Sequence, residues 1–254
     1  MKIAEVFNKN NKTLIGYIPV GYPQLHSTIE LVSLLVDSGC DIIELGIPFS
    51  DPIGDGPVIQ NACYLALQNS VTVAYCLETA AALKGKVNIP LVFMGYYNPI
   101  LRYGITEFVA ASARAGISGL IVPDLPPEEA TPLAQACEEN GLDLIYLITP
   151  TSTAERIKLV ARKSSGFIYL VSTSGVTGVK KNLSSNLGSL VGRVRKYTDK
   201  PICVGFGIGS AKQAAEVSQL ADGVIIGSRL IKLIEEDKTY RQLTAFVSTV
   251  KAAI

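Results

Sequence analysis

Eight short apolar runs recur along the 254 residues, and they restrict the possible folds more than any other feature of the sequence. Each run is roughly five to eight residues long, and most are apolar at nearly every position, which is typical of strands covered on both faces. The runs are residues 13–20, 41–47, 90–96, 118–124, 143–149, 166–172, 201–207 and 222–228. We therefore expect a parallel sheet with both faces buried.

Helical segments alternate with these runs. Their apolar residues lie three and four positions apart, the spacing of one helix face, in residues 27–39, 106–116, 128–141 and 211–223. In several cases a glycine stands between the helix and the next strand, where it adopts the left-handed conformation of a helix C-terminus without strain. These glycines are Gly39, Gly116, Gly141 and Gly166.

Strand, helix and short connection, repeated eight times over 254 residues, match the size and rhythm of a (β/α)8 barrel. The sequence shows no Pro- or Ser-rich linker, charge block or low-complexity segment at which to divide it. Residues 1–254 are therefore predicted to form a single-domain (β/α)8 TIM barrel, an α/β fold. An open doubly wound sheet is the alternative, disfavoured because no G-x-G-x-x-G follows the first run.

The composition favours a small-molecule role. Lys and Arg number 23 against 22 Asp and Glu, and a formal charge of +1 provides no field for nucleic acid or an anionic membrane. Five scattered cysteines without a CxxC pair indicate buried thiols in a reducing compartment. The N-terminal segment is too polar for a signal peptide, and no apolar run approaches the roughly 20 residues that span a bilayer. We expect a soluble cytoplasmic protein.

Two connections are too long for the regular rhythm of the chain. They are residues 48–62, after the second predicted strand, and residues 173–188, after the sixth. In a barrel the chemistry lies at the carboxyl ends of the strands, so long loops at that end are expected to be lids or binding loops.

Glu44 is the only charged residue inside its apolar strand. Strand alternation places it on the same side as Ile42 and Gly46. A poorly solvated carboxyl has a raised pKa, which suits it to carry a proton at neutral pH. The alternative is a structural carboxylate paired with a polar neighbour, but an ionisable group buried at a strand end is costly to keep without a use.

Glycine-bearing turns follow the last two predicted strands, in residues 205–210 and 226–231, and both precede helical segments. Backbone N–H groups at a helix N-terminus attract an anion, and the loops after strands seven and eight bind phosphate in many barrels. A single GxG is weak evidence, since glycines at helix starts are often steric. Two of them in this pair of loops predict a phosphate-binding site.

The residues that are missing narrow the chemistry further. His26 is the only histidine, so a histidine-rich metal site is excluded, and no lysine lies inside a predicted strand to form a Schiff base. No histidine at a strand end is available to activate a cysteine. Proton transfer by carboxyl groups remains, and the candidates are Glu44, Asp51, Asp55 and Asp124.

The segment IELGIPFSDPIGDGP, residues 43–57, resembles the signature of tryptophan synthase alpha chains. The chain length and further motifs agree along nearly the whole sequence: YYNP (96–99), PDLP (123–126), IYLVSTSGVTG (168–178), GFGI (205–208) and IIGS (225–228). The resemblance implies a lyase of tryptophan biosynthesis that splits indole-3-glycerol phosphate into indole and glyceraldehyde 3-phosphate by a retro-aldol reaction. It implies neither a metal nor an organic cofactor.

The resemblance also assigns roles to particular residues. Glu44 matches the general acid-base, Asp55 the second catalytic carboxylate, and Tyr169 an active-site tyrosine, for which ordinary core packing is the alternative. Thr177 matches a residue that contacts the second-loop aspartate when the loops close. Matches to the phosphate site are Gly178, Gly207, Gly227 and Ser228. Matches to the indole pocket are Tyr17, Tyr96, Leu147 and Phe206. Two departures are Gly54, where alanine is common, and Thr173, where some members carry arginine.

A beta-chain partner is implied as well, in an alpha2beta2 heterotetramer that receives indole from the barrel. The expected docking surface comprises the second loop, with Asp51 and Pro52, and the region of Asn98. One alternative is a stand-alone indole-3-glycerol-phosphate lyase that uses the same site. Another is a barrel that binds a phosphorylated ligand without catalysis, which the presence of Glu44, Asp55 and Tyr169 disfavours.

Overall fold

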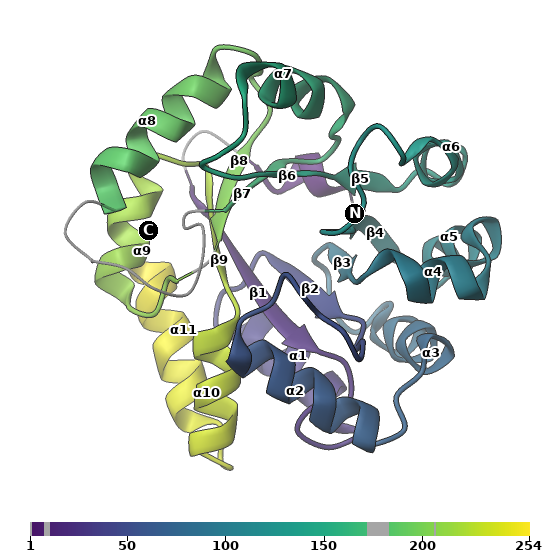
Figure 1. Ribbon diagram of the computed structural model, residues 1–254. Coiled ribbons are helices and arrows are strands. Elements are labelled where there is room, and N and C mark those ends of the chain that lie inside the picture. Colours follow the sequence, from purple (N-terminus) through teal and green to yellow (C-terminus); the bar gives the residue numbers. More distant parts are fainter. Residues whose placement is uncertain (1, 8–10, 172–182, 206) are drawn as a thin grey trace.

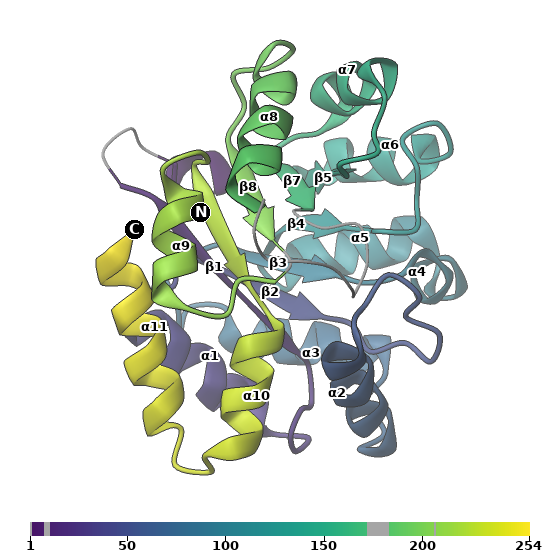
Figure 2. The same ribbon diagram turned by 60° about the vertical axis from the view of Figure 1, so that its left-hand side comes forward.

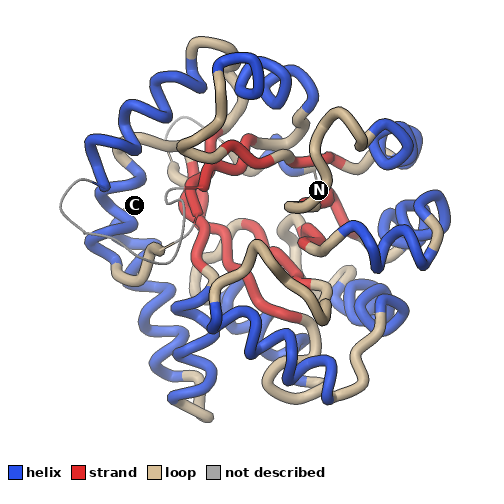
Figure 3. The backbone as a smooth tube through the Cα atoms, viewed as in Figure 1, coloured by secondary structure: helices blue, strands red, loops and turns tan. Residues whose placement is uncertain are grey.

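The strands form a ring of parallel strands surrounded by helices (Figures 1 and 3). The computed structural model describes residues 2–7, 11–171, 183–205 and 207–254, without the side chains of 183–186. The strands are β1 (Thr13–Pro19), β2 (Ile42–Gly46), β3 (Leu91–Met94), β4 (Ile117–Ile121), β5 (Asp143–Ile145), β6 (Leu147–Ile148), β7 (Ile168–Val171), β8 (Ile202–Gly205) and β9 (Gly223–Ile226). Each lies within or at the edge of one predicted run, and the TIM barrel is confirmed.

The fifth predicted run is divided into β5 and β6 at Tyr146. β5 pairs with β4, and β6 pairs with β7, so the two halves together close the sheet whose order is β5-β4-β3-β2-β1-β9-β8-β7-β6. The carbonyl of Tyr146 accepts a hydrogen bond of 3.2 Å from the backbone N–H of Tyr169. The break therefore interrupts the regular ladder without opening the ring.

Helices cover the outside of the ring (Figures 1 and 2). They are η1 (Ile3–Glu5), α1 (Ser27–Asp37), α2 (Pro57–Gln68), α3 (Val73–Leu83), α4 (Tyr97–Tyr103), α5 (Ile105–Arg114), α6 (Thr131–Asn140), α7 (Ala154–Lys163), α8 (Leu183–Arg195), α9 (Ala211–Ser218), α10 (Ser228–Glu236) and α11 (Arg241–Ala253). The four predicted helical segments correspond to α1, α5, α6 and α9. The connections after β2, β3 and β9 each contain two helices where the regular repeat predicted one.

The glycines between helices and strands adopt the conformation expected of them. Their φ angles are +110° at Gly39, +90° at Gly116, +70° at Gly141 and +69° at Gly166. The five cysteines are buried and free of disulfides, as expected: Cys40, Cys63, Cys76, Cys137 and Cys203. Within the described ranges, no helix has the length and apolarity needed to cross a membrane.

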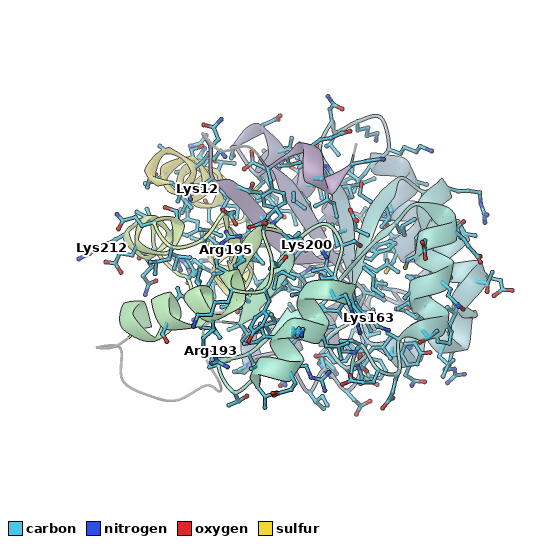
Figure 4. All side chains as sticks on the ribbon, turned by 90° about the horizontal axis from the view of Figure 1, so that it is seen from above. Lys12, Lys163, Arg193, Arg195, Lys200 and Lys212 are labelled. Carbon is cyan, nitrogen blue, oxygen red and sulfur yellow. The ribbon has the colours of Figure 1, made fainter. Side chains whose placement is uncertain are left out.

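Figure 4 labels six cations in the view from above: Lys12, Lys163, Arg193, Arg195, Lys200 and Lys212. All of them except Lys212 donate hydrogen bonds to backbone carbonyls of the chain. Lys12 donates to the carbonyl of Ala221 at 2.8 Å, and Arg195 forms an ion pair with Asp222. Lys200 donates to the carbonyls of Ala161 and Ser164, at and just after the end of α7, at 2.8 and 2.6 Å. These contacts therefore join the ends of neighbouring helices and strands, and leave these cations with little capacity for an external anion.

Replacing Lys200 by methionine is expected to lower the free energy of unfolding by about 1.5–3 kcal/mol, since a charged donor to two carbonyls is lost. For a chain of this size the corresponding fall in Tm is roughly 3–10 °C. The matched control is Lys212→Met, which removes an exposed lysine of α9. Equal Tm losses in the two variants would show that the contacts of Lys200 contribute nothing specific.

Candidate active site

Glu44 lies in the middle of β2 with its side chain fully buried, at 0% exposure. It stands opposite Tyr17 of β1 and Val92 of β3 in the sheet register. Neither carboxyl oxygen has a hydrogen-bond partner among the described residues. Burial raises the pKa of Glu44 to about 8, so the carboxyl is mostly protonated at neutral pH. The structure thus places a protonated carboxyl inside the barrel, and no described residue forms a hydrogen bond with it.

Asp55 lies in the loop between β2 and α2, at the carboxyl end of the barrel strands. The hydroxyl of Tyr96 donates a hydrogen bond of 3.1 Å to its Oδ2 and accepts one of 3.0 Å from the backbone N–H of Gly54. Phe49 stacks on the Tyr96 ring, with 5.4 Å between centroids. The loop is therefore tied to the first residues after β3 through one tyrosine.

The carboxyl of Asp55 is half-buried. Burial raises its pKa to about 6, against the opposing effect of the hydrogen bond from Tyr96. The two candidate catalytic carboxyls consequently differ in their protonation at neutral pH, with Asp55 mostly ionised and Glu44 mostly neutral. Paired carboxyls with separated pKa values are the usual arrangement for an acid and an electrostatic stabiliser.

Tyr169 of β7 extends into the same region. Its side chain is 4% exposed, and a Cβ atom added to Gly205 would lie 2.5 Å from its hydroxyl oxygen, so the hydroxyl lies against the end of β8. Its pKa is raised well above the ordinary value by burial first, then by the charges of Glu44 and Asp55. The barrel thus brings all three predicted catalytic residues together.

The start of α10 has the features of an anion site. Gly227 is the N-cap residue and Ser228 the first residue of the helix, and neither a side-chain cap nor an acidic residue occupies its first turn. The start of α9 is more occupied, because the hydroxyl of Ser210 accepts from the N–H of Gln213 at 3.2 Å. Gly207, with φ of +84°, precedes this helix and is exposed. Of the two turns, α10 has the freer N–H groups.

Other predicted residues have more varied positions. Tyr17 and Tyr96 are buried, at 5% exposure each, and Leu147 is half-buried. Four of the predicted residues lie outside the described part of the chain, namely Thr173, Thr177, Gly178 and Phe206.

The two other carboxyl candidates lie outside the enclosed region. Asp51 is exposed, and Asp124 accepts a hydrogen bond of 2.9 Å from the backbone N–H of Tyr97, which makes it a cap at the start of α4. Of the four carboxyl candidates, the structure brings only Glu44 and Asp55 into the enclosed region.

Two polar contacts could not be anticipated from the sequence. The bond from Tyr96 to Asp55 joins residues that are 41 positions apart, and Cys63 of α2 contacts the Tyr17 hydroxyl at 3.9 Å. The family resemblance assigns both tyrosines to the indole pocket and gives their hydroxyls no role. In the parts of the chain that the structure describes, no group of three or more His, Cys, Asp or Glu residues could hold a metal ion.

A family model and curated relatives of this chain carry the same description. The sequence model of the family described as "Tryptophan synthase alpha chain" matches residues 3–253. The chain belongs to this family. A tryptophan synthase alpha chain of Dehalococcoides mccartyi is 54% identical over 100% of this chain and 99% of its own length. That of Methanosarcina acetivorans is 47% identical over 100% and 92%.

Solved structures agree with this family assignment. A chain of Mycobacterium tuberculosis tryptophan synthase has a TM-score of 0.92 and 42% identity, covering 99% of this chain and 97% of that one. The tryptophan synthase alpha chain of Legionella pneumophila has a TM-score of 0.90 and 35% identity, covering 100% and 97%. This alpha chain therefore shares both the sequence and the barrel of its relatives along nearly their whole length.

Proposed function

We propose that Glu44 and Asp55 are the catalytic carboxyls with which this alpha chain cleaves indole-3-glycerol phosphate into indole and glyceraldehyde 3-phosphate. The observation that carries the proposal is the pair itself. A fully buried, neutral carboxyl without a described partner lies in electrostatic range of the same tyrosine hydroxyl as a second, ionised carboxyl. Structural carboxylates normally have their oxygens satisfied, so Glu44 is better explained as a group that meets a substrate.

The reaction needs a proton on C3 of the indole before the side chain can leave. Protonated Glu44 donates it, and C3 becomes tetrahedral while positive charge develops on the indole nitrogen. Asp55 accepts a hydrogen bond from that N–H and stabilises the charge. The Glu44 carboxylate then takes the proton of the adjacent chain hydroxyl, the carbon–carbon bond breaks, and its electrons return to the ring. Indole and the aldehyde result, and Glu44 is again protonated.

The remaining residues bind and enclose the substrate. The uncapped start of α10, with Gly227 and Ser228, offers N–H groups to the phosphate, with Gly207 on the neighbouring turn. Tyr169 positions the bond between indole C3 and the glycerol chain beside Glu44. We assign Gly178 to the same phosphate site, Phe206 to the indole pocket and Thr177 to loop closure on the family resemblance alone.

A surface for the beta chain lies around the loop that carries Asp55. Asp51 and Asn98 are exposed there, with Pro52 partly so. Ile53 in the same loop is 85% exposed and Leu101 on α4 is 53% exposed. Large apolar side chains held in water beside a catalytic loop are typical of a protein interface. We infer that the beta chain docks here, and that it thereby orders the loop and Asp55.

Indole release from indole-3-glycerol phosphate, measured with and without a beta chain, tests the assignment. A subunit of the synthase is expected to be slow alone and to be accelerated when the beta chain is added. A stand-alone lyase would be equally fast in both conditions. A barrel that only binds a phosphorylated ligand would release no indole in either.

The two pKa values predict a bell-shaped pH dependence of kcat/KM. Activity requires ionised Asp55, so the rate rises as pH increases through about 6. It also requires protonated Glu44, so the rate falls as pH increases through about 8. Initial rates across this range, with the beta chain present, measure both limbs. A rate that rises through the alkaline limb would mean that Glu44 acts first as a base.

A further inference from the structure

The hydroxyl of Tyr17 is a buried polar group at the site that the mechanism above does not use. Tyr17 lies on β1 directly opposite Glu44, with 5% of its side chain exposed. Among the described residues its hydroxyl has one hydrogen-bond partner, the sulfur of Cys63 at 3.9 Å. A thiol is a weak donor and a weak acceptor, so most of the bonding capacity of the hydroxyl remains unused. A phenylalanine would fill the same space without that cost.

The Tyr17 side chain spans the distance between the two ends of the proposed site. At its base, a Cβ atom added to Gly227 would lie 3.2 Å from Cδ1 of Tyr17. At its tip, a Cβ atom added to Gly46 would lie 2.4 Å from the hydroxyl oxygen. The ring therefore runs from the start of α10, where we place the phosphate, to the end of β2, two residues beyond Glu44. Only a glycine at position 46 leaves room for the hydroxyl.

The hydroxyl at that place is a proton donor. Burial first, then the neighbouring Cys63 and the charges of Asp55 and Glu44, raises the pKa of Tyr17 well above its ordinary value. The phenol is thus protonated throughout the working pH range, and it lies within electrostatic range of both catalytic carboxyls. The hydroxyl therefore lies at the carboxyl end of the site, and the base of the same ring lies at the phosphate turn.

Indole-3-glycerol phosphate carries two hydroxyl groups on the chain between its indole ring and its phosphate, and one of them is on the carbon next to the ring, where the proposed chemistry of Glu44 takes place. We propose that Tyr17 is a substrate-binding residue whose hydroxyl donates a hydrogen bond to a hydroxyl oxygen of the glycerol chain. The inference rests on the proposed substrate and goes beyond it. It assigns a polar contact, and selectivity for a hydroxylated chain, to a residue that otherwise appears as apolar wall.

Equilibrium binding to two ligands tests the proposal. One is indole-3-glycerol phosphate, held intact by using the Glu44→Gln background. The other is its dehydroxy analogue, with indole joined to phosphate through an unsubstituted propyl chain. Adding Tyr17→Phe is expected to weaken binding of the first ligand by about 3- to 10-fold, the effect of one neutral hydrogen bond, and to leave binding of the second unchanged.

A matched control is Tyr146→Phe, which also removes a buried hydroxyl without a described partner, but one that lies near Cys137 of α6 and outside the site. It is expected to change the affinity for neither ligand. Equal losses for both ligands in Tyr17→Phe would mean that the residue acts through packing, and unchanged affinity for both would mean that the hydroxyl is idle. Either result overturns the proposal. Cleavage persisting in Glu44→Gln would instead refute the proposed function.

Discussion

Replacing Glu44 by glutamine is expected to reduce kcat for indole release by about 10²–10⁴-fold, the usual contribution of a positioned acid-base group. Glutamine has nearly the size of the neutral carboxyl that occupies the site, but it can neither donate the proton to C3 nor take one from the chain hydroxyl. Affinity for phosphate-bearing ligands is expected to be retained, because the proposed phosphate site, with Gly227 and Ser228, lies at the start of α10 and not on β2. The measurement is kcat for indole release with the beta chain present. A variant with most of its activity would contradict the mechanism.

The same variant has a stability readout that separates chemistry from folding. Burial raises the pKa of Glu44 from its ordinary 4.5 to about 8 in the folded chain, so folding favours the protonated form. The associated stability is fully present below pH 4.5 and is lost as pH rises through about 8. Glutamine does not ionise, so Glu44→Gln should match the wild-type Tm in acid and exceed it in alkali. A lower Tm in alkali would contradict burial as the cause.

The barrel was predictable because its signal is repeated. Eight apolar runs recur, four helical segments alternate with them and four glycines stand before strands, so an error in one unit would not change the predicted fold. The break at Tyr146 was not predictable, since residues 143–149 are as continuous as the other runs and the interruption arises from pairing with two different neighbours. The second helix after β2 was also missed. It follows a turn in which Ser70, not a glycine, has φ of +62°.

Some residues of the candidate site could also be predicted from the sequence, and others could not. Glu44 could be recognised because a charge inside an apolar strand has few explanations, and the raised pKa follows from burial alone. Asp124 remained among the carboxyl candidates, because its partner, the N–H of Tyr97, belongs to a different connection of the barrel and cannot be read from the sequence. The contacts of the Tyr17 and Tyr96 hydroxyls could not be predicted from the sequence either. Their contacts join elements that come together only when the sheet closes.

Replacing Asp55 by asparagine or alanine is expected to lower kcat by about 10²–10³-fold, the cost of removing one group that stabilises transition-state charge. Asparagine keeps a partner for the Tyr96 hydroxyl, which bonds to Asp55 Oδ2 at 3.1 Å, and so should keep the loop in place. It lacks the negative charge that faces the indole nitrogen. Alanine removes both the charge and the partner of Tyr96. Equal kcat losses in the two variants would show that the charge of Asp55 accounts for the effect. A larger loss in the alanine variant would show that Asp55 also positions the loop.

The pH profile of the Asp55→Asn variant, with Asp124→Asn as a control, tests whether the ionised carboxylate of Asp55 is required. The acidic limb near pH 6 belongs to its carboxyl, so Asp55→Asn should lose that limb and retain the alkaline limb of Glu44. Asp124→Asn removes an exposed carboxylate that caps α4, and is expected to lose some stability while keeping kcat. A defect of Asp55→Asn confined to KM, with the acidic limb unchanged, would make Asp55 a binding residue and assign the stabilisation of indole charge elsewhere.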